Sequence, residues 1–206
     1  MALLFLGLIF SCKKDPIQYT FQGTVQESVN TANLSGVKVT ISQRVYDGNV
    51  ASSFFNSVGS LITDANGYYE LSFKREKVVE FKIELLKTGY FEFEEIINSS
   101  EVSTAEPNIF NYSLEPKSWI RFNLMNLGGF TTDEFTMIHY NFKEDCEGCT
   151  TNEYYYYNGI VDSTFTYTST GGEYVRYSYK IPGGTVYVQD SVYTTLFDTV
   201  VVNLNY

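Results

Sequence analysis

The chain has 206 residues, of which 14 are Lys or Arg and 24 are Asp or Glu, so its formal net charge is −10. This acidic balance argues against a nucleic-acid partner, because binding to phosphates needs a basic patch. It also argues against electrostatic adhesion to anionic lipid. Aromatic residues make up 17% of the chain and Pro occurs only four times, a composition typical of strands more than of helices.

The chain starts with MALLFLGLIFSC, a short apolar run that ends in a cysteine. A membrane-spanning helix needs about 20 apolar residues, and this run is about half as long. It therefore fits the core of a signal peptide, although no Lys or Arg precedes it. We expect residues 1–11 to be a signal peptide and residues 12–18 to be a tether.

The tetrapeptide Ile9-Phe10-Ser11-Cys12 resembles a bacterial lipobox, in which the cysteine sulfur receives a diacylglycerol and the chain is cut just before the cysteine. The resemblance implies lipidation of Cys12, as in Gram-negative surface or outer-membrane lipoproteins. The expected location is then the outer membrane or cell surface, with the periplasmic face as an alternative. Two or three acyl chains on Cys12 would hold the protein on the membrane almost permanently. The other interpretation is an uncleaved hydrophobic N-terminus with an incidental cysteine.

Apolar and polar residues alternate from Gln18 onward, the period of strands with one buried face. A hairpin is predicted at residues 64–67 (DANG), because Asn-Gly supplies the positive φ angles of tight turns. Seven strands in about 98 residues indicate an antiparallel Greek-key sandwich. The inward-facing residues are predicted to be Tyr19, Phe21, Val25, Val37, Val39, Ile41, Tyr69, Leu71, Phe73, Val79, Phe81, Ile83, Leu85, Phe91, Phe93, Phe110, Tyr112 and Leu114.

Four pieces of this half share an order and a spacing: residues 21–25 (FQGTV), 35–41 (SGVKVTI), 63–69 (TDANGYY) and 87–90 (KTGY). Together they resemble the carboxypeptidase regulatory-like domain, which has a transthyretin-like sandwich. The resemblance covers roughly residues 19–115. It implies a structural or docking role, because such domains carry no catalytic residues of their own.

A calcium loop starting at Asp64 is excluded by its spacing. The EF-hand pattern requires a glutamate at its twelfth position, and that position is Arg75.

Residues 115–118 (EPKS) form a break too short for free domain movement, and Pro116 disfavours a continuous ladder across it. We therefore predict two domains, residues 19–117 and 118–206. In the second, inward-facing sets are expected at Ile120, Phe122 and Leu124, and at Ile138, Tyr140 and Phe142. Further strands are predicted at 154–157, 160–167, 174–181, 185–188 and 199–204, which completes an all-β chain of two antiparallel β-sandwich domains in tandem.

Cys146 and Cys149 are separated by two residues in a polar loop. A disulfide is favoured in an oxidising compartment, and free thiols are an alternative. A thioredoxin-like motif belongs between a strand and a helix, and no helix is predicted here. A zinc site would need His139, the only histidine, together with further ligands such as Asp145 or Glu144. We expect neither a metal nor a cofactor.

No catalytic constellation is evident. A Ser-His-Asp triad could use only His139, and no Gly-x-Ser-x-Gly elbow surrounds a serine. Carboxylates are plentiful, but nothing singles out a pair for hydrolysis. The chain is therefore expected not to be an enzyme, with a hydrolase that uses scattered carboxylates as the alternative.

Four consecutive tyrosines, Tyr154, Tyr155, Tyr156 and Tyr157, must place two side chains on each face of a strand. One pair can belong to the core, and the other is exposed or covered by a partner. Exposed aromatic rings can stack on sugars or anchor a protein interface. Ordinary cross-strand packing is the competing explanation.

Three Asp-Ser/Thr-apolar motifs resemble the acceptor for O-glycans of some Gram-negative bacteria, with Ser163, Ser191 and Thr199 as the acceptor residues. The function indicated is a lipid-anchored cell-envelope protein that acts as a non-catalytic binding or scaffold component of a surface assembly. Its partners would be the membrane, through acyl chains on Cys12, and an envelope protein or glycan. The alternative within the binding class is a glycan-binding lipoprotein that uses the exposed tyrosines.

Overall fold

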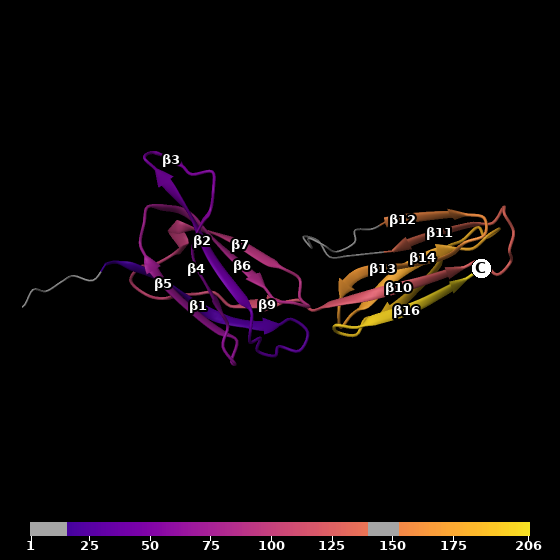
Figure 1. Cartoon of the computed structure of the whole chain (residues 1–206), viewed down its shortest axis with the longest axis horizontal. Helices are drawn as coiled ribbons and strands as arrows, with labels where there is room; N and C mark the ends of the chain where they lie inside the picture. The colour runs from indigo at the N-terminus through magenta and orange to yellow at the C-terminus, as the bar shows by residue number, and fades with distance from the viewer. Residues whose placement is uncertain (1–15, 140–152) are drawn as a thin grey trace, which may run out of the picture.

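The computed structural model describes residues 16–139 and 153–206 (Figure 1). This part of the chain contains sixteen strands and one short 3₁₀ helix (Ser99–Glu101), and no α-helix, which confirms the all-β class. None of its helices is long and apolar enough to span a membrane. Figure 1 shows two β-domains arranged end to end along the long axis of the molecule.

The first domain is a sandwich of two sheets. One sheet has the order β5-β1-β8, with β9 also paired to β1, and the other has the order β3-β2-β6-β7, with β4 also paired to β2. Its strands are β1 (Gln18–Glu27), β2 (Lys38–Asp47), β3 (Val50–Ala51), β4 (Asn56–Ile62), β5 (Tyr68–Lys74), β6 (Val78–Leu86), β7 (Phe93–Asn98), β8 (Asn108–Ile109) and β9 (Tyr112–Leu114).

Between these sheets lies the first hydrophobic core, built mostly from the predicted period-2 residues, with Leu34, Val78, Tyr90 and Ile97 in addition. The ring of Phe21 lies 5.4 Å from that of Phe73 and 5.0 Å from that of Phe81, both in edge-to-face geometry, an arrangement that adds to the energy of burial. The register between β2 and β6 shifts between Arg44 and Val45. As a result Val78 is the buried residue, whereas Val79 was predicted to face inward. Leu71, Phe93 and Phe110 are only partly buried, because they lie at the rim of the core.

Residues 64–67 form the predicted turn, but the prediction of a hairpin is wrong, because the two strands that the turn connects do not pair with each other. The Asp64 carboxylate accepts the backbone N–H groups of Asn66 (2.8 Å) and Tyr68 (2.9 Å), and Gly67 has φ +72°. However, β4 pairs with β2 and β5 pairs with β1, so the turn connects the two sheets. The turn residues determine the local reversal of the chain, whereas the hydrogen-bonding partner of each strand is decided by packing across the whole domain.

Each domain also contains parallel pairing, two pairs in the first domain and one in the second, whereas antiparallel sandwiches were predicted. In the first domain β1 runs parallel to β8 and β9, and in the second β10 runs parallel to β16. All other strand pairs in the described part of the chain are antiparallel. Parallel neighbours must be distant in sequence, so alternation within one strand does not reveal them.

The second domain consists of a three-stranded sheet, β13-β10-β16, packed on a four-stranded sheet, β12-β11-β14-β15. In β11 the fully buried residues are Phe135 and Met137, so the predicted inward position of Ile138 is wrong. Tyr140 and Phe142 lie outside the described residues. The strands are β10 (Lys117–Met125), β11 (Glu134–His139), β12 (Glu153–Asn158), β13 (Asp162–Thr170), β14 (Tyr174–Lys180), β15 (Val188–Tyr193) and β16 (Thr199–Asn205).

Candidate functional site

Three predicted site residues, Cys12, Cys146 and Cys149, lie outside the described residues, as do Glu144 and Asp145. Lipidation of Cys12 and a Cys146–Cys149 disulfide therefore stay predictions. Within residues 16–139 and 153–206, no group of three or more His, Cys, Asp or Glu side chains is placed to hold a metal ion.

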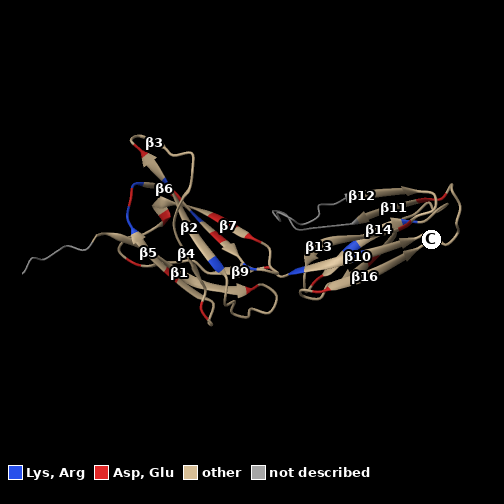
Figure 2. Ribbon diagram, viewed as in Figure 1, with Lys and Arg blue, Asp and Glu red and all other residues tan. Residues whose placement is uncertain are grey.

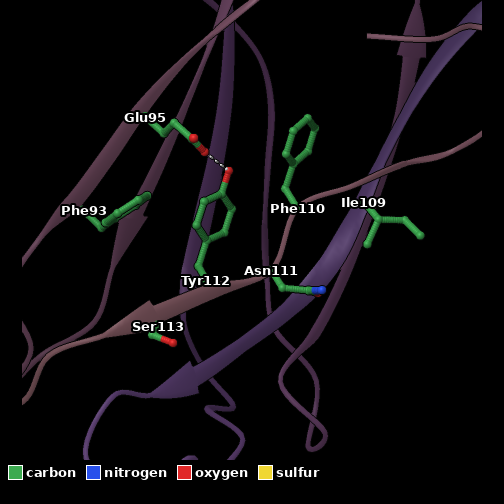
Figure 3. A pocket seen from close by; sticks show the side chains of 7 residues that line it. All are labelled: Phe93, Glu95, Ile109, Phe110, Asn111, Tyr112 and Ser113. Carbon is green, nitrogen blue, oxygen red and sulfur yellow. Dashed lines mark hydrogen bonds between the residues drawn. The ribbon is translucent and has the colours of Figure 1, made fainter. Parts of the chain in front are cut away.

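One hollow of the first domain, of about 550 Å³, opens between the edge strand β7 and the segment of β8 and β9 (Figure 3). Figure 3 shows the Tyr112 ring at its centre, with Phe93 and Phe110 on either side and the Glu95 carboxylate above the Tyr112 hydroxyl. Seven residues line it: Phe93, Glu95, Ile109, Phe110, Asn111, Tyr112 and Ser113.

One wall of this hollow depends on Gly23. A Cβ atom at this position would lie 1.8 Å from the backbone oxygen of Phe110, so only glycine lets the chain between β8 and β9 run this close to β1. The same oxygen accepts the Tyr69 hydroxyl at 2.8 Å. The Asn111 side chain accepts the backbone N–H of Thr24 at 2.9 Å, which replaces a missing ladder bond. The hollow is therefore a built feature of the sandwich edge.

Glu95 is the only carboxylate in this lining, and it has a structural partner. The Tyr112 hydroxyl donates to Glu95 Oε2 at 2.7 Å, and Glu95 pairs in register with Ile83, a fully buried residue. A charged residue on the inward side of an edge strand discourages pairing with another chain. Glycoside hydrolysis would need two carboxyl groups flanking the bond, and this hollow offers one.

The tyrosines of β12 divide between the two faces of the strand, as predicted. Tyr155 and Tyr157 pack against the second core, and the Tyr155 ring stacks 5.7 Å from that of Phe165. Tyr154 and Tyr156 are 62% and 51% exposed. Two of the four predicted ligand-binding residues are thus committed to the core, and two remain accessible on the outer face.

Tyr154 has a partner that the sequence pattern did not indicate. Its hydroxyl lies 3.0 Å from the hydroxyl of Tyr187, which directly precedes β15. Because β11 and β14 separate β12 from β15, the two rings must extend across both strands. Tyr154 lies in the cross-strand row of Ile138 and Ser178, and Ser178, central on this outer face, is 1% exposed. The result is an aromatic surface formed by Tyr154, Tyr156 and Tyr187.

The three predicted glycosylation residues lie in or at strands of the second domain. Ser191 is exposed on β15, and Ser163 and Thr199 are partly buried near the starts of β13 and β16. The backbone N–H groups of Ser191 and Thr199 each donate to the preceding aspartate, at 2.7 Å. The aspartates of these two motifs therefore also make a local side-chain bond to the backbone.

Lys117 forms the junction between the domains. Its backbone N–H donates to Gly89 O of the first domain at 2.7 Å, and its carbonyl accepts the N–H of Phe197 of the second domain at 2.9 Å. Its ammonium lies 5.2 Å from the centroid of the Phe91 ring, which is within the range of a cation–π contact. One residue thus bonds to both bodies through its backbone.

Aromatic packing supports this junction. The Phe197 ring lies 5.2 Å from that of Tyr90 in an edge-to-face arrangement. Tyr90 is buried, and its hydroxyl donates at 2.8 Å to Glu27, whose carboxylate is also buried. Phe197 has φ +60°, a conformation that costs a non-glycine residue about 1–2 kcal/mol. The contacts of the ring and the backbone bond to Lys117 offset that cost.

Charged residues of both signs are interspersed over the first domain (Figure 2). Lys82, for example, bridges Glu84 at 2.9 Å and Glu94 at 3.3 Å. These carboxylates lie on the β6–β7 surface beside a second hollow of about 450 Å³. Surface pairs of this kind contribute little to stability, and they neutralise each other's fields locally.

Comparison with known proteins identifies no family: no family model and no curated protein matches the chain. A streptococcal ancillary pilin is 14% identical over 94% of this chain and 63% of that chain, with a TM-score of 0.39. The Bacillus anthracis TIE protein is 10% identical over 92% of this chain and 34% of that chain, with a TM-score of 0.38. A minor pilin of Streptococcus agalactiae is 9% identical over 91% of this chain and 94% of that chain, with a TM-score of 0.37. This chain thus spans less than two thirds of the length of the first two. The likenesses are too remote to indicate a function.

Sequence reasoning missed Tyr187, Phe197 and Glu95 as residues of interest. Tyr187 and Phe197 lie just outside strands, where period-2 alternation carries no information. Glu95 was visible as an acidic residue in a strand, but its inward position depends on the register with β6.

Buried tyrosines predict a loss of stability in alkali. Burial raises the pKa of Tyr69, Tyr90 and Tyr112 above the ordinary 10.0, with help from the neighbouring carboxylates Glu27 and Glu95. These hydroxyls stay neutral in the fold and ionise in the unfolded chain, so their stabilisation is complete below pH 10 and declines as the pH rises further. Urea unfolding monitored against pH, with tyrosinate absorbance, measures this decline.

The variant Tyr112→Phe should lose about 1 kcal/mol at neutral pH, because Glu95 loses its donor, and should decline less steeply above pH 10. Tyr46→Phe, at an exposed tyrosine, serves as the control. An unchanged alkaline slope for Tyr112→Phe would show that Tyr112 does not contribute to it.

Proposed function

We propose that this chain is a lipid-anchored, non-catalytic scaffold component of a bacterial cell surface, in which two rigidly joined β-domains hold the second domain away from the anchor. The proposal combines the lipobox-like tetrapeptide before Lys13 with the architecture of the body. The outer membrane is the location that the resemblance to Gram-negative lipoproteins implies.

The observation that carries this proposal is the junction at Lys117. Backbone bonds to Gly89 and Phe197 and the packing of Tyr90 on Phe197 leave no free linker between the domains. The described chain starts at the end of the first domain that is remote from the second, and β16 runs to the opposite end of the molecule (Figure 1). A tether at residues 12–18 would therefore attach one end of a rod and display the other.

We also propose that the first domain is of the carboxypeptidase regulatory-like kind. Each of the four matching sequence pieces contains a glycine that the structure requires. Gly36, Gly67 and Gly89 have φ between +72° and +85°, and Gly23 allows the close approach of Phe110. Only glycine adopts such conformations without strain, so the spacing of the pieces has a physical reason.

Lipidation predicts that Cys12→Ser releases the protein from membranes into soluble fractions when it is produced in a Gram-negative host with residues 1–11 present. Cys146→Ser is the matched control and should stay with the membranes. Fractionation followed by intact-mass measurement tests both variants. If Cys12→Ser remains in the membrane fraction, the anchor is something other than acyl chains on this cysteine.

Rigidity of the rod predicts that Phe197→Gly loosens the angle between the domains. Glycine suits φ +60° and removes the ring from Tyr90, so the junction is weakened without new backbone strain. Small-angle scattering should give a broader distribution of interatomic distances for this variant, whereas Phe54→Gly, at a ring 75% exposed in the first domain, should leave it unchanged. Equal distributions for wild type and Phe197→Gly would argue against the junction as the source of rigidity.

A second candidate function, glycan binding by the second domain, is favoured by one observation. Tyr154 and Tyr187 extend over β11 and β14 with their hydroxyls 3.0 Å apart, next to the exposed Tyr156. Rings that lie along a sheet present apolar faces on which a sugar can stack, with hydroxyl groups at the rim.

Glycan binding predicts that the chain is retained by at least one carbohydrate on an array of bacterial and host glycans, and that Tyr154→Ala lowers this binding about tenfold or more, through loss of a stacking ring. Phe130→Ala, at a ring 65% exposed outside the tyrosine surface, should bind like wild type. A silent array, or equal binding by both variants, would eliminate this candidate.

A further inference from the structure

The strand β13 lies at an edge of its sheet and has an unusual sequence. Among the described residues its one strand partner is β10, so no described strand pairs with its other side. Residues 163–169 read Ser-Thr-Phe-Thr-Tyr-Thr-Ser, which is a palindrome about Thr166 if Phe and Tyr are treated as equivalent. A palindromic edge strand is complementary to itself in antiparallel pairing.

Three other edge strands among the described residues carry charged side chains that discourage pairing, whereas β13 and β16, the two edges of one sheet, carry none beyond Asp162. The inward side of β7 holds Glu95, β5 includes Glu70 and Lys74, and β15 includes Asp190. Beyond Asp162 at its start, β13 has neither a charged residue, nor Pro, nor Gly, and no bulge interrupts its nine-residue pairing with β10. Natural proteins usually protect long, uncharged edges, so this one is suited to be paired.

We propose that β13 pairs with β13 of a second copy of this chain, antiparallel and centred on Thr166, so that the two three-stranded sheets form one continuous six-stranded sheet. The proposal is independent of lipidation at Cys12. A two-fold axis through Thr166 makes the interface isologous, the commonest arrangement of homodimers. A residue a given number of positions before Thr166 then lies opposite the residue the same number of positions after Thr166 in the second copy, on the same face of the sheet.

In this register no opposed pair brings like charges together, and aromatic and hydroxyl side chains lie opposite their own kind. On the inner face Phe165 lies opposite Tyr167 of the second copy and Ser163 opposite its Ser169, and on the outer face Thr164 lies opposite its Thr168. Aromatic pairs and Thr–Thr pairs each contribute roughly 0.2–1 kcal/mol across strands. The aspartate at the start of the strand, Asp162, lies opposite Thr170 of the second copy, so the two negative charges do not face each other.

The sheet already contains the rows that the pairing would extend. On the outer face the Thr164 hydroxyl donates to Asn123 at 3.1 Å, and Asn123 donates to Asn203 at 2.8 Å, a polar row across β13, β10 and β16. On the inner face Phe165 is partly buried beneath Tyr155 and Tyr157 of β12. Antiparallel pairing of β13 places the first domains at opposite ends of the dimer, because the Thr170 end of the strand faces the junction.

The test introduces a carboxylate at the proposed axis. Thr166 and Val201 both flank Arg121, from β13 and from β16 respectively, and both are exposed on the outer face. Thr166→Glu therefore gains the same neighbour in the monomer as Val201→Glu, but only Thr166→Glu places two like charges opposite each other in the dimer. The chain from residue 13 onward is used, because it contains every described residue of both hydrophobic cores.

Light scattering during gel filtration should give twice the monomer mass for wild type and for Val201→Glu, and the monomer mass for Thr166→Glu, with unchanged near-ultraviolet circular dichroism in all three. A monomeric wild type at every soluble concentration would overturn the proposal. A dimeric Thr166→Glu, or a monomeric Val201→Glu, would place the interface elsewhere and overturn it too.

A cysteine scan tests the register separately, in a background of Cys146→Ser and Cys149→Ser. Opposed residues of antiparallel strands have Cα atoms about 4.5–5.5 Å apart, which a disulfide can bridge. Thr166→Cys should therefore cross-link to itself under mild oxidation, whereas Thr164→Cys should not, because it faces residue 168 of the second copy. Combining Thr164→Cys with Thr168→Cys should restore the cross-link, and efficient cross-linking of Thr164→Cys alone would contradict the register.

Discussion

The backbone of Lys117 is the constraint on which the arrangement of this molecule depends. Its N–H bonds to the first domain at Gly89 and its carbonyl to the second at Phe197, and β10 begins at this residue. The Lys117 ammonium lies over the Phe91 ring, and the Tyr90 and Phe197 rings pack edge to face at the same junction. Two separate hydrophobic cores are thereby joined without a flexible linker.

That junction decides which surfaces are available. With the domains end to end, sheet edges and outer faces lie along the sides of the molecule (Figure 1). The edges differ in charge. Glu95, with its Tyr112 partner, protects β7, whereas β13 beyond Asp162 presents an uncharged, self-complementary edge. The tyrosine surface of the opposite sheet is a third feature, in which hydroxyl groups and rings are held at fixed positions by the strands beneath.

The alternation of apolar and polar residues predicted some buried side chains correctly and others incorrectly. Alternation placed Phe21, Phe81 and Phe122 in the cores, because a period of two leaves one face for burial. It failed for Ile138, because the dense apolar stretch around β11 supports either register, and burial of Phe135 and Met137 selects one. It also divided the tyrosines of β12 correctly between the two faces, but the partnership of Tyr154 with Tyr187 joins residues whose strands never pair directly.

The sequence by itself determined the β class, the turn glycines, the alternation that builds two cores and the palindrome of β13, because each of these is local chemistry of a few neighbouring residues. Only the tertiary structure decided that the turn at residues 64–67 connects two sheets, that β1 and β10 pair in parallel with the last strands of their domains, and that β13 lies at an edge. Strand partners are chosen by the burial of whole faces, a free energy summed over residues far apart in the chain.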